Sequence, residues 1–251
     1  MEIETSYLKF VRNMTPEGYK LLCFPYAGGG ASFYAGWQQY MPEVEILPVQ
    51  LPGRENRMGE PLFRELGSAV EAITEAVFPI IEKSEFSIFG HSMGGILGYE
   101  TAKSLESLGA GPQLCFISAT SVDERPKDVL SSELSEDDFF LRVSEYGAID
   151  ETSEILEYPE FREIFMKVLR ADFGIIESYK KTETILHCPV VTLCGDEDPM
   201  MTIARMDSWK NFAERIWMRR EFTGGHFYIN DHREELCKLL KDTIKNFGRN
   251  K

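Results

Sequence analysis

A Gly-x-Ser-x-Gly pentapeptide at residues 90–94 constrains the fold of this chain more than any other feature. An apolar run at 86–89 precedes it, and a segment of helical character follows it as far as residue 109. A strand, a sharp turn and a helix are the parts of a nucleophile elbow, in which a strained turn projects the serine hydroxyl outward. Glycine is required on both sides because a Cβ there would crowd the neighbouring strand or helix. We therefore predict that Ser92 is a nucleophile and that the N–H of Met93, at the helix start, faces a developing oxyanion.

The rest of the chain alternates between strand-like and helix-like segments. Short apolar runs predict strands at 20–25, 44–50, 86–89, 113–119, 189–194 and 216–222. Amphipathic spacing predicts helices at 32–41, 62–82, 202–212 and 233–247, in addition to the one after the elbow. This alternation is typical of an α/β domain with a mostly parallel central sheet flanked by helices. We expect residues 1–251 to form one such domain.

The alternation stops between residues 121 and 188. Residues 131–140 read as a capped helix start and residues 158–181 as a long helix, with no strand between them. We expect 121–188 to be a helical insertion between two strands, placed like a lid over the active-site end of the sheet. The alternative is a helical extension that only packs.

Charge and cysteine usage restrict the partners and the compartment. The net charge of −14 and the lack of a basic stripe argue against nucleic-acid binding. No apolar run is long enough to span a membrane, and residues 1–13 lack the apolar core of a signal peptide. The five cysteines include no C-x-x-C pair, so neither disulfides nor a metal site is expected. We expect a cytoplasmic monomer that needs no cofactor and contacts no membrane.

A serine nucleophile needs a base within hydrogen-bond reach and an acid that orients this base. Of the four histidines, His226 is the candidate base because it follows two glycines at a strand end, on a loop able to reach the elbow. His91 adjoins the nucleophile but lies on the wrong side of the turn. His187 is interpreted as structural and His232 as solvated.

Two aspartates compete for the role of the acid, since both follow the predicted strand at 189–194. Asp198 stands next to Pro199, which can fix its direction. Asp196 has the position of a residue that caps or stabilises the turn. The residues alone leave both candidates open.

Three consecutive glycines, at 28–30, follow the first predicted strand, where the backbone must approach something closely. A phosphate-binding loop does not fit, because no Lys-Ser/Thr follows and the G-x-G-x-x-G spacing is absent. In hydrolases with a nucleophile elbow, this loop supplies the second oxyanion donor. The N–H of Ala27 is our candidate, and a plain flexible turn is the alternative.

Five segments together resemble the type II thioesterases, the stand-alone editing hydrolases of nonribosomal peptide and polyketide synthesis. They are Phe24-Pro25-Tyr26-Ala27-Gly28-Gly29, Gln50-Leu51-Pro52-Gly53-Arg54-Glu55, Gly90-His91-Ser92-Met93-Gly94-Gly95, Leu169-Arg170-Ala171-Asp172-Phe173 and Gly224-Gly225-His226-Phe227. The resemblance covers most of the chain and implies an α/β-hydrolase fold with a helical lid. It implies Ser92, Asp198 and His226 as the catalytic triad, and the amides of Ala27 and Met93 as the oxyanion hole.

The implied reaction is hydrolysis of a short or misprimed acyl group from the phosphopantetheine arm of an acyl or peptidyl carrier protein. Tyr26, where the family commonly has a histidine, and the Met200-Met201 pair depart from the family pattern and can alter acyl preference. A generic acyl-CoA thioesterase or small-ester esterase is the alternative, as is a non-catalytic module that binds an acyl group or a partner. A local basic patch at Arg215, Arg219 and Arg220 is a candidate docking surface, although a solvated strand edge explains it more simply.

Overall fold

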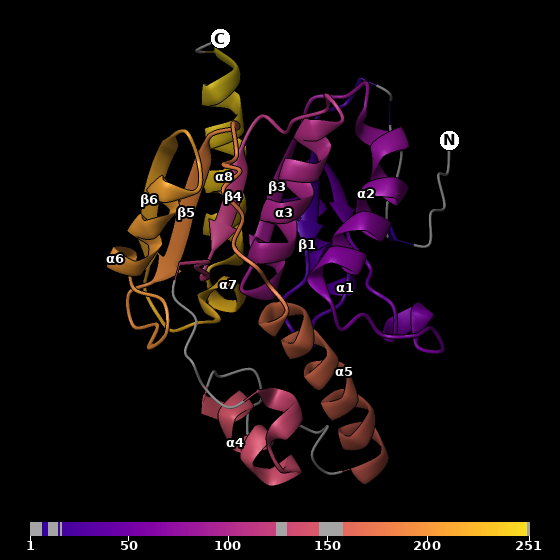
Figure 1. Ribbon diagram of the computed structural model, residues 1–251. Helices are drawn as coiled ribbons and strands as arrows, with labels where there is room; N and C mark the ends of the chain where they lie inside the picture. Colours follow the sequence, from indigo (N-terminus) through magenta and orange to yellow (C-terminus); the bar gives the residue numbers. More distant parts are fainter. Residues whose placement is uncertain (1–6, 10–14, 16, 124–129, 146–157, 250–251) are drawn as a thin grey trace.

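The computed structural model describes residues 7–9, 15, 17–123, 130–145 and 158–249. At its centre lies a parallel six-stranded sheet with the strand order β2-β1-β3-β4-β5-β6 (Figure 1). The strands are β1 (Lys20–Phe24), β2 (Glu45–Pro48), β3 (Phe86–His91), β4 (Cys115–Ser118), β5 (Val190–Gly195) and β6 (Ile216–Phe222). The predicted α/β class with a parallel sheet is confirmed.

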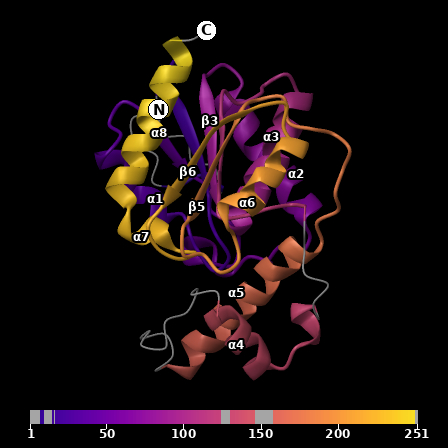
Figure 2. The same ribbon diagram turned by 90° about the vertical axis from the view of Figure 1, so that its left-hand side faces the viewer.

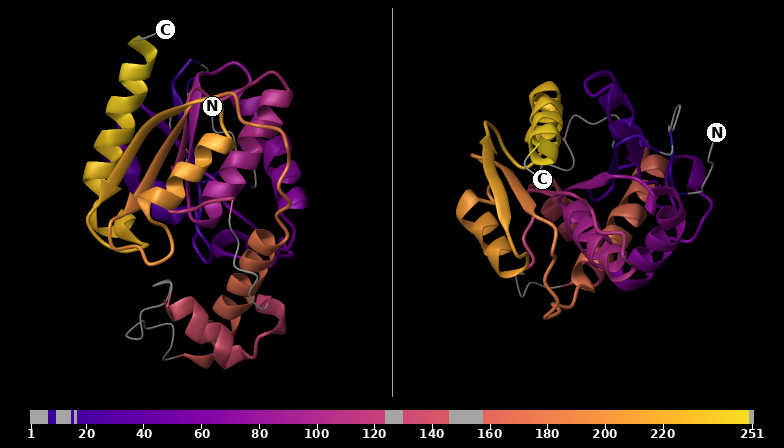
Figure 3. Two further views of the ribbon diagram at one scale, coloured as in Figure 1. Left: turned by 60° about the vertical axis from the view of Figure 1, so that its left-hand side comes forward. Right: turned by 90° about the horizontal axis from the view of Figure 1, so that it is seen from above.

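Helices cover both faces of the sheet, as the two views in Figure 3 show. The α-helices are α1 (Ser32–Ala35), α2 (Leu66–Ile81), α3 (Met93–Ser107), α4 (Glu136–Glu145), α5 (Pro159–Glu177), α6 (Ile203–Met206), α7 (Tyr228–Asp231) and α8 (Arg233–Arg249). Side chains of β1 alternate between two apolar cores: Leu22 packs with α2 and α3, and Leu21 packs with α8. Because helices cover both faces, the strands β1, β3, β4 and β5 are buried along their whole length and are mostly apolar.

Several element boundaries differ from those predicted. The helix expected at 62–82 begins only at Leu66, because Leu62 packs against Gly53 and the N–H of Leu66 donates to the hydroxyl oxygen of Ser178 at 2.8 Å. The helices expected at 32–41 and 202–212 each divide into a short α-helix followed by a 3-10 turn. The strands expected at 44–50 and 113–119 pair over only four residues each.

Helices α4 and α5 lie beyond the carboxyl ends of the strands (Figures 1 and 2), and the C-terminal end of α5 packs against α2 and α3. Ser135 caps α4 by accepting the N–H of Asp138 at 3.1 Å, so the predicted capped helix start exists, one residue before Glu136. The long helix expected at 158–181 is α5. Residues 124–129 and 146–157 of the predicted insertion lie outside the described residues. Within the described ranges, no helix has both the length and the apolar character to cross a membrane.

Candidate active site

Ser92 occupies a sharp turn between β3 and α3, with φ 53° and ψ −121°. This left-handed backbone is unusual for a residue other than glycine. A Cβ at Gly90 would lie 2.0 Å from the carbonyl oxygen of Gly94, and a Cβ at Gly94 would lie 2.3 Å from that of Phe24. The two glycines are therefore required by close backbone contacts, and the strand–turn–helix is the one that the sequence predicted.

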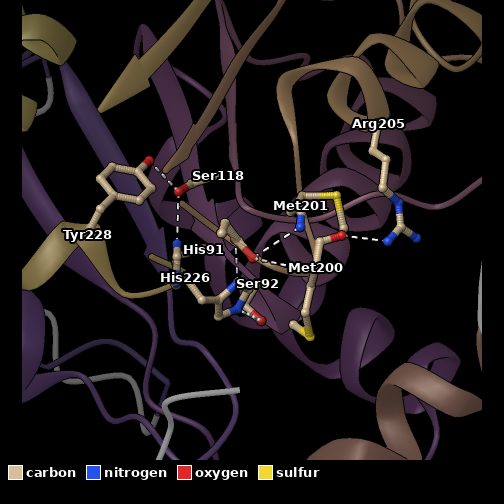
Figure 4. A network of polar contacts seen from close by, with 9 residues as sticks. His91, Ser92, Ser118, Met200, Met201, Arg205, His226 and Tyr228 are labelled. Carbon is tan, nitrogen blue, oxygen red and sulfur yellow. Dashed lines mark hydrogen bonds and ion pairs between the residues drawn. The ribbon is translucent and has the colours of Figure 1, made fainter. Parts of the chain in front are cut away.

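Ser92, His226 and Asp198 form a hydrogen-bonded triad, although Ser92 and His226 are 134 positions apart (Figure 4). Nε2 of His226 lies 3.1 Å from Oγ of Ser92, and Nδ1 lies 2.7 Å from Oδ2 of Asp198. The three come from loops at the carboxyl ends of β3, β5 and β6, which meet because neighbouring parallel strands end at the same edge of the sheet. Asp198 is 3% exposed and His226 6%, so bulk water hardly competes for these bonds.

The backbone around Asp198 fixes the direction of its carboxylate. Oδ1 accepts the N–H groups of Met200 and Met201 at 2.8 and 3.0 Å, and Arg205 in turn donates to the carbonyl of Met200 (Figure 4). Asp196, the other candidate acid, instead accepts the N–H of Gly224 at 2.9 Å. It thereby stabilises the loop that carries His226.

The two candidate oxyanion donors are the backbone amides of Ala27 and Met93. Neither the N–H of Ala27 nor that of Met93 donates to any residue that the structure describes. The neighbours of Ala27 are both engaged: Gly28 N–H donates to the carboxylate of Asp172, and Gly29 N–H donates to the carbonyl of Tyr26. The loop therefore leaves the amide of Ala27 as its one free donor among residues 27–29.

A buried ion pair, the Arg54–Asp172 clamp, joins α5 to this loop. Both terminal nitrogens of Arg54 donate to the carboxylate of Asp172, at 2.8 and 2.7 Å, and Nη1 also donates to the carbonyl of Gly29. Asp172 lies on α5 and accepts the N–H of Gly28 at 2.7 Å. The sequence supplied both residues within motif segments but gave neither a role, because the pairing partner is 118 positions away.

The other three histidines lie apart from the serine hydroxyl. Nδ1 of His91 bonds Ser118, and burial together with the neighbouring His226 holds the pKa of His91 well below its ordinary value. His187 is exposed, and its hydrogen bond to Glu214 raises the pKa of its imidazole. His232 pairs with Glu235 at the start of α8.

The described residues offer no group of three or more His, Cys, Asp or Glu side chains arranged to hold a metal ion. All five cysteines are buried free thiols. Burial raises the pKa values of these thiols, which keeps them protonated.

A parallel sheet, a strained serine at the end of a central strand, and an acid and a histidine on later loops define the α/β-hydrolase class. The thioesterase domain family model matches residues 19–244, and the chain belongs to this family. It is 32% identical to the gramicidin S biosynthesis protein GrsT of Aneurinibacillus migulanus, over 88% of this chain and 89% of that protein. It is 34% identical to the human medium-chain S-acyl fatty acid synthase thioesterase, over 90% of this chain and 86% of that protein.

Solved structures agree with this assignment. The thioesterase RedJ from the prodiginine biosynthetic pathway of Streptomyces coelicolor superposes with a TM-score of 0.79 at 30% identity, over 91% of this chain and 87% of that one. The predicted thioesterase family and the predicted enzyme class, a hydrolase acting on thioester bonds, are confirmed.

Proposed function

We propose that this thioesterase removes short or misprimed acyl groups from the phosphopantetheine arms of carrier proteins in peptide or polyketide synthesis, through an acyl-Ser92 intermediate. The observation that carries the proposal is the hydrogen-bonded Ser92–His226–Asp198 triad in a chain of this family. Its relatives include a protein of gramicidin S biosynthesis, a thioesterase of fatty acid synthase and a thioesterase of the prodiginine biosynthetic pathway.

In the first half-reaction, Nε2 of His226 accepts the hydroxyl proton of Ser92 as Oγ attacks the thioester carbonyl. Asp198 accepts the Nδ1–H of His226, holds the reactive tautomer and stabilises the imidazolium that forms. The negative charge on the carbonyl oxygen is stabilised by the amides of Ala27 and Met93. The C–S bond then breaks, the arm leaves as a thiol that takes the proton from His226, and the acyl group remains on Ser92.

In the second half-reaction, His226 removes a proton from water while the water oxygen attacks the acyl-Ser92 carbonyl. The resulting tetrahedral intermediate expels the serine oxygen, which recovers its proton from His226, and the free acid departs. A thioester suits this site because a thiolate is a good leaving group and needs less protonation than the amine of an amide. All these steps use side chains and amides of the chain, so we propose that no metal or cofactor takes part.

The lid side of the site is apolar. Phe139, Val143, Met166 and Leu169 form a small core that packs against Ala27, the proposed oxyanion donor. The Arg54–Asp172 clamp ties α5 to the same loop. We propose that side chains from α4 and α5 line the space for the acyl group and set the acyl preference.

The proposed partner is an acyl or peptidyl carrier protein. We propose that the enzyme acts on it as a monomer in the cytoplasm. The candidate basic patch on β6 is largely neutralised, since Arg219 pairs with Asp207 at 2.6 Å and Arg220 with Glu235 at 3.0 Å. These exposed pairs support the solvated strand edge as the explanation of that patch. We therefore do not assign the carrier to β6.

The test is hydrolysis of acetyl-loaded carrier protein, followed by loss of the acyl mass. We expect turnover by the native chain, and a decrease in kcat of at least ~10³-fold in Ser92→Ala. The stability of Ser92→Ala should match that of the native chain, because the hydroxyl is not part of the core. Rapid hydrolysis of simple esters without turnover of the carrier would overturn the proposed substrate, and equal activity on free acyl-CoA would identify a generic thioesterase. A fluorophosphonate that fails to label Ser92 would contradict the acyl-Ser92 intermediate and favour the alternative of a non-catalytic binding module.

A further inference from the structure

A second chain of hydrogen bonds lies directly behind the triad (Figure 4). Nδ1 of His91 lies 2.8 Å from Oγ of Ser118, and this oxygen lies 2.7 Å from the hydroxyl of Tyr228. We call these three residues the His91 relay. His91 ends β3, Ser118 ends β4, and Tyr228 begins α7, two positions after His226. All three side chains are buried, so the relay joins the strand that carries the nucleophile to the loop that carries the base.

The ring of His91 packs against the ring of His226. The two ring centroids are 5.1 Å apart, and Phe227 contacts both rings, at 5.5 Å from His91 and 5.2 Å from His226. Hydrogen bonds to Ser92 and Asp198 fix the edges of the His226 ring, but they do not by themselves fix its tilt. Packing against two neighbouring rings supplies this restraint.

Counting donors assigns the direction of the relay. If Tyr228 donates to Ser118 and Ser118 donates to Nδ1 of His91, each hydroxyl hydrogen has an acceptor, and the hydrogen of His91 lies on Nε2. The reverse direction leaves the Tyr228 hydrogen without an acceptor among the described residues. Nε2 of His91 is buried without a partner in either case. The forward direction therefore leaves fewer unsatisfied groups and is favoured.

The His91 relay also keeps an uncharged ring beside the base. In the assigned direction Nδ1 is an acceptor and takes no proton, and burial opposes the charged form, which lowers the pKa of His91. The titratable side chains whose rings contact His91 are His226, Tyr26 and Tyr228. Burial raises the pKa values of both tyrosines, so they stay neutral. A second positive charge next to His226 would oppose its conversion to imidazolium, and the relay prevents it.

We infer that His91 is a positioning residue for His226: its neutral ring, held by Ser118 and Tyr228, sets the tilt of the base toward Ser92. The inference rests on the proposed function, because it takes His226 as the base. It adds a role for the residue that precedes the nucleophile, which the sequence placed on the wrong side of the turn for proton transfer.

The test uses two variants that disturb the relay in different ways. Tyr228→Phe keeps every ring and removes the outer donor of the relay. His91→Asn keeps an oxygen able to accept from Ser118 and removes the ring that contacts His226. We expect kcat to fall about tenfold in Tyr228→Phe and on the order of 10- to 100-fold in His91→Asn, with KM within about twofold of native in both, because a tilted base is poorly aligned for proton transfer.

The matched control is Tyr19→Phe. The hydroxyl of Tyr19 lies 2.7 Å from Oγ of Ser87, at the opposite end of β3, so the variant loses the same kind of bond far from the triad. We expect Tyr19→Phe and Tyr228→Phe to lose similar amounts of thermal stability, but only Tyr228→Phe to lose kcat. Equal kcat in these two variants, or a loss expressed in KM, would overturn the positioning role.

Two further readouts separate this inference from the proposed function. The rate of Ser92 labelling by a fluorophosphonate should fall in parallel with kcat, and it reports the positioning of the base even if carrier thioesters are not the substrate. The acidic limb of the pH profile of kcat/KM should keep its midpoint in His91→Asn, since a neutral His91 contributes no titration. A displaced midpoint, or unchanged labelling in His91→Asn, contradicts the inference.

Discussion

Two aspartates lie buried at the carboxyl end of the same sheet, and their side-chain partners differ: Asp198 bonds a histidine and Asp172 bonds an arginine. Asp198 is bonded to two backbone amides and to His226, the proposed base. Asp172 is bonded to one backbone amide and to Arg54, which is permanently charged. The carboxylates are almost equally hidden from water, at 3% and 0% exposure. The comparison teaches that the partner, and not burial, decides whether such a group serves chemistry or holds the structure together.

The largest expected effect is on kcat, through Asp198. In Asp198→Asn the amide can donate to Nδ1 of His226, which favours the tautomer that cannot accept the Ser92 proton. We expect kcat to fall on the order of 10⁴-fold, with a melting temperature near that of the native chain. Steady-state kinetics and thermal melting of the same preparation check the expected kcat and the expected melting temperature. An active Asp198→Asn would break the comparison, because Asp198 would then be structural like Asp172.

Asp172→Ala should show the opposite pattern. It leaves Arg54 buried without its partner, and we expect a loss of about 3–5 kcal/mol in the free energy of unfolding, measured with urea. The kcat of the folded enzyme should fall far less than in Asp198→Asn, because the clamp holds the loop of the proposed oxyanion donor but no atom of the clamp bonds Ser92 or His226. The double variant Arg54→Met/Asp172→Leu should recover part of the stability, because it removes both charges together. A loss of kcat without a loss of stability would contradict this.

His91 extends the comparison to a third case, a buried ionisable group without a charged partner. Its pKa is lowered in the folded chain, so below its ordinary value of about 6.5 the unfolded chain binds more protons than the folded one. The contribution of His91 to the free energy of unfolding is therefore complete above this pH. It is lost as the pH falls below this value, with a slope of up to about 1.4 kcal/mol per pH unit. Urea unfolding between about pH 5 and pH 6 should show a smaller slope in His91→Asn than in the native chain.

His187→Asn is the control for that slope. The pKa of His187 is raised, so its effect on stability is present below its ordinary pKa and disappears as the pH rises above it. Its replacement should therefore leave the slope between about pH 5 and pH 6 unchanged. If His91→Asn and His187→Asn behave alike, His91 is not held neutral by the fold.

The smallest expected effects are on the free energy of unfolding, and they come from backbone strain at Ser92 and Gly28. Ser92 has a positive φ of 53° although it carries a side chain, so its backbone is strained. Gly28, whose N–H donates to Asp172, has a φ of 78°, which glycine adopts without strain. Ser92→Gly should raise the free energy of unfolding by about 1 kcal/mol while abolishing activity. Gly28→Ala should lower it by about 1–2 kcal/mol, because of the same strain and a contact of 2.9 Å with Leu169. Chemical denaturation detects both, and equal signs for the two variants would show that Ser92 is not strained.

The elements that sequence analysis placed well are those with a strong local cause. The parallel strands follow from apolar runs buried on both faces, and the turn at Ser92 follows from two glycines that backbone contacts require. Helix boundaries were less certain: α2 begins at Leu66 because Ser178, on a distant segment, completes its first turn. Local spacing contains no record of that contact.

The sequence by itself determined the class of fold, the serine on its turn and the family to which the chain belongs, because each depends on neighbouring residues or on a motif. The acid of the triad was harder to predict, because Asp196 and Asp198 are two positions apart and residue types alone did not show which of them bonds the histidine. Only the tertiary structure places Asp198 beside His226 and Asp196 on Gly224. It also pairs Arg54 with Asp172 and His91 with Ser118, since bonds between distant segments depend on how strands and loops meet in space.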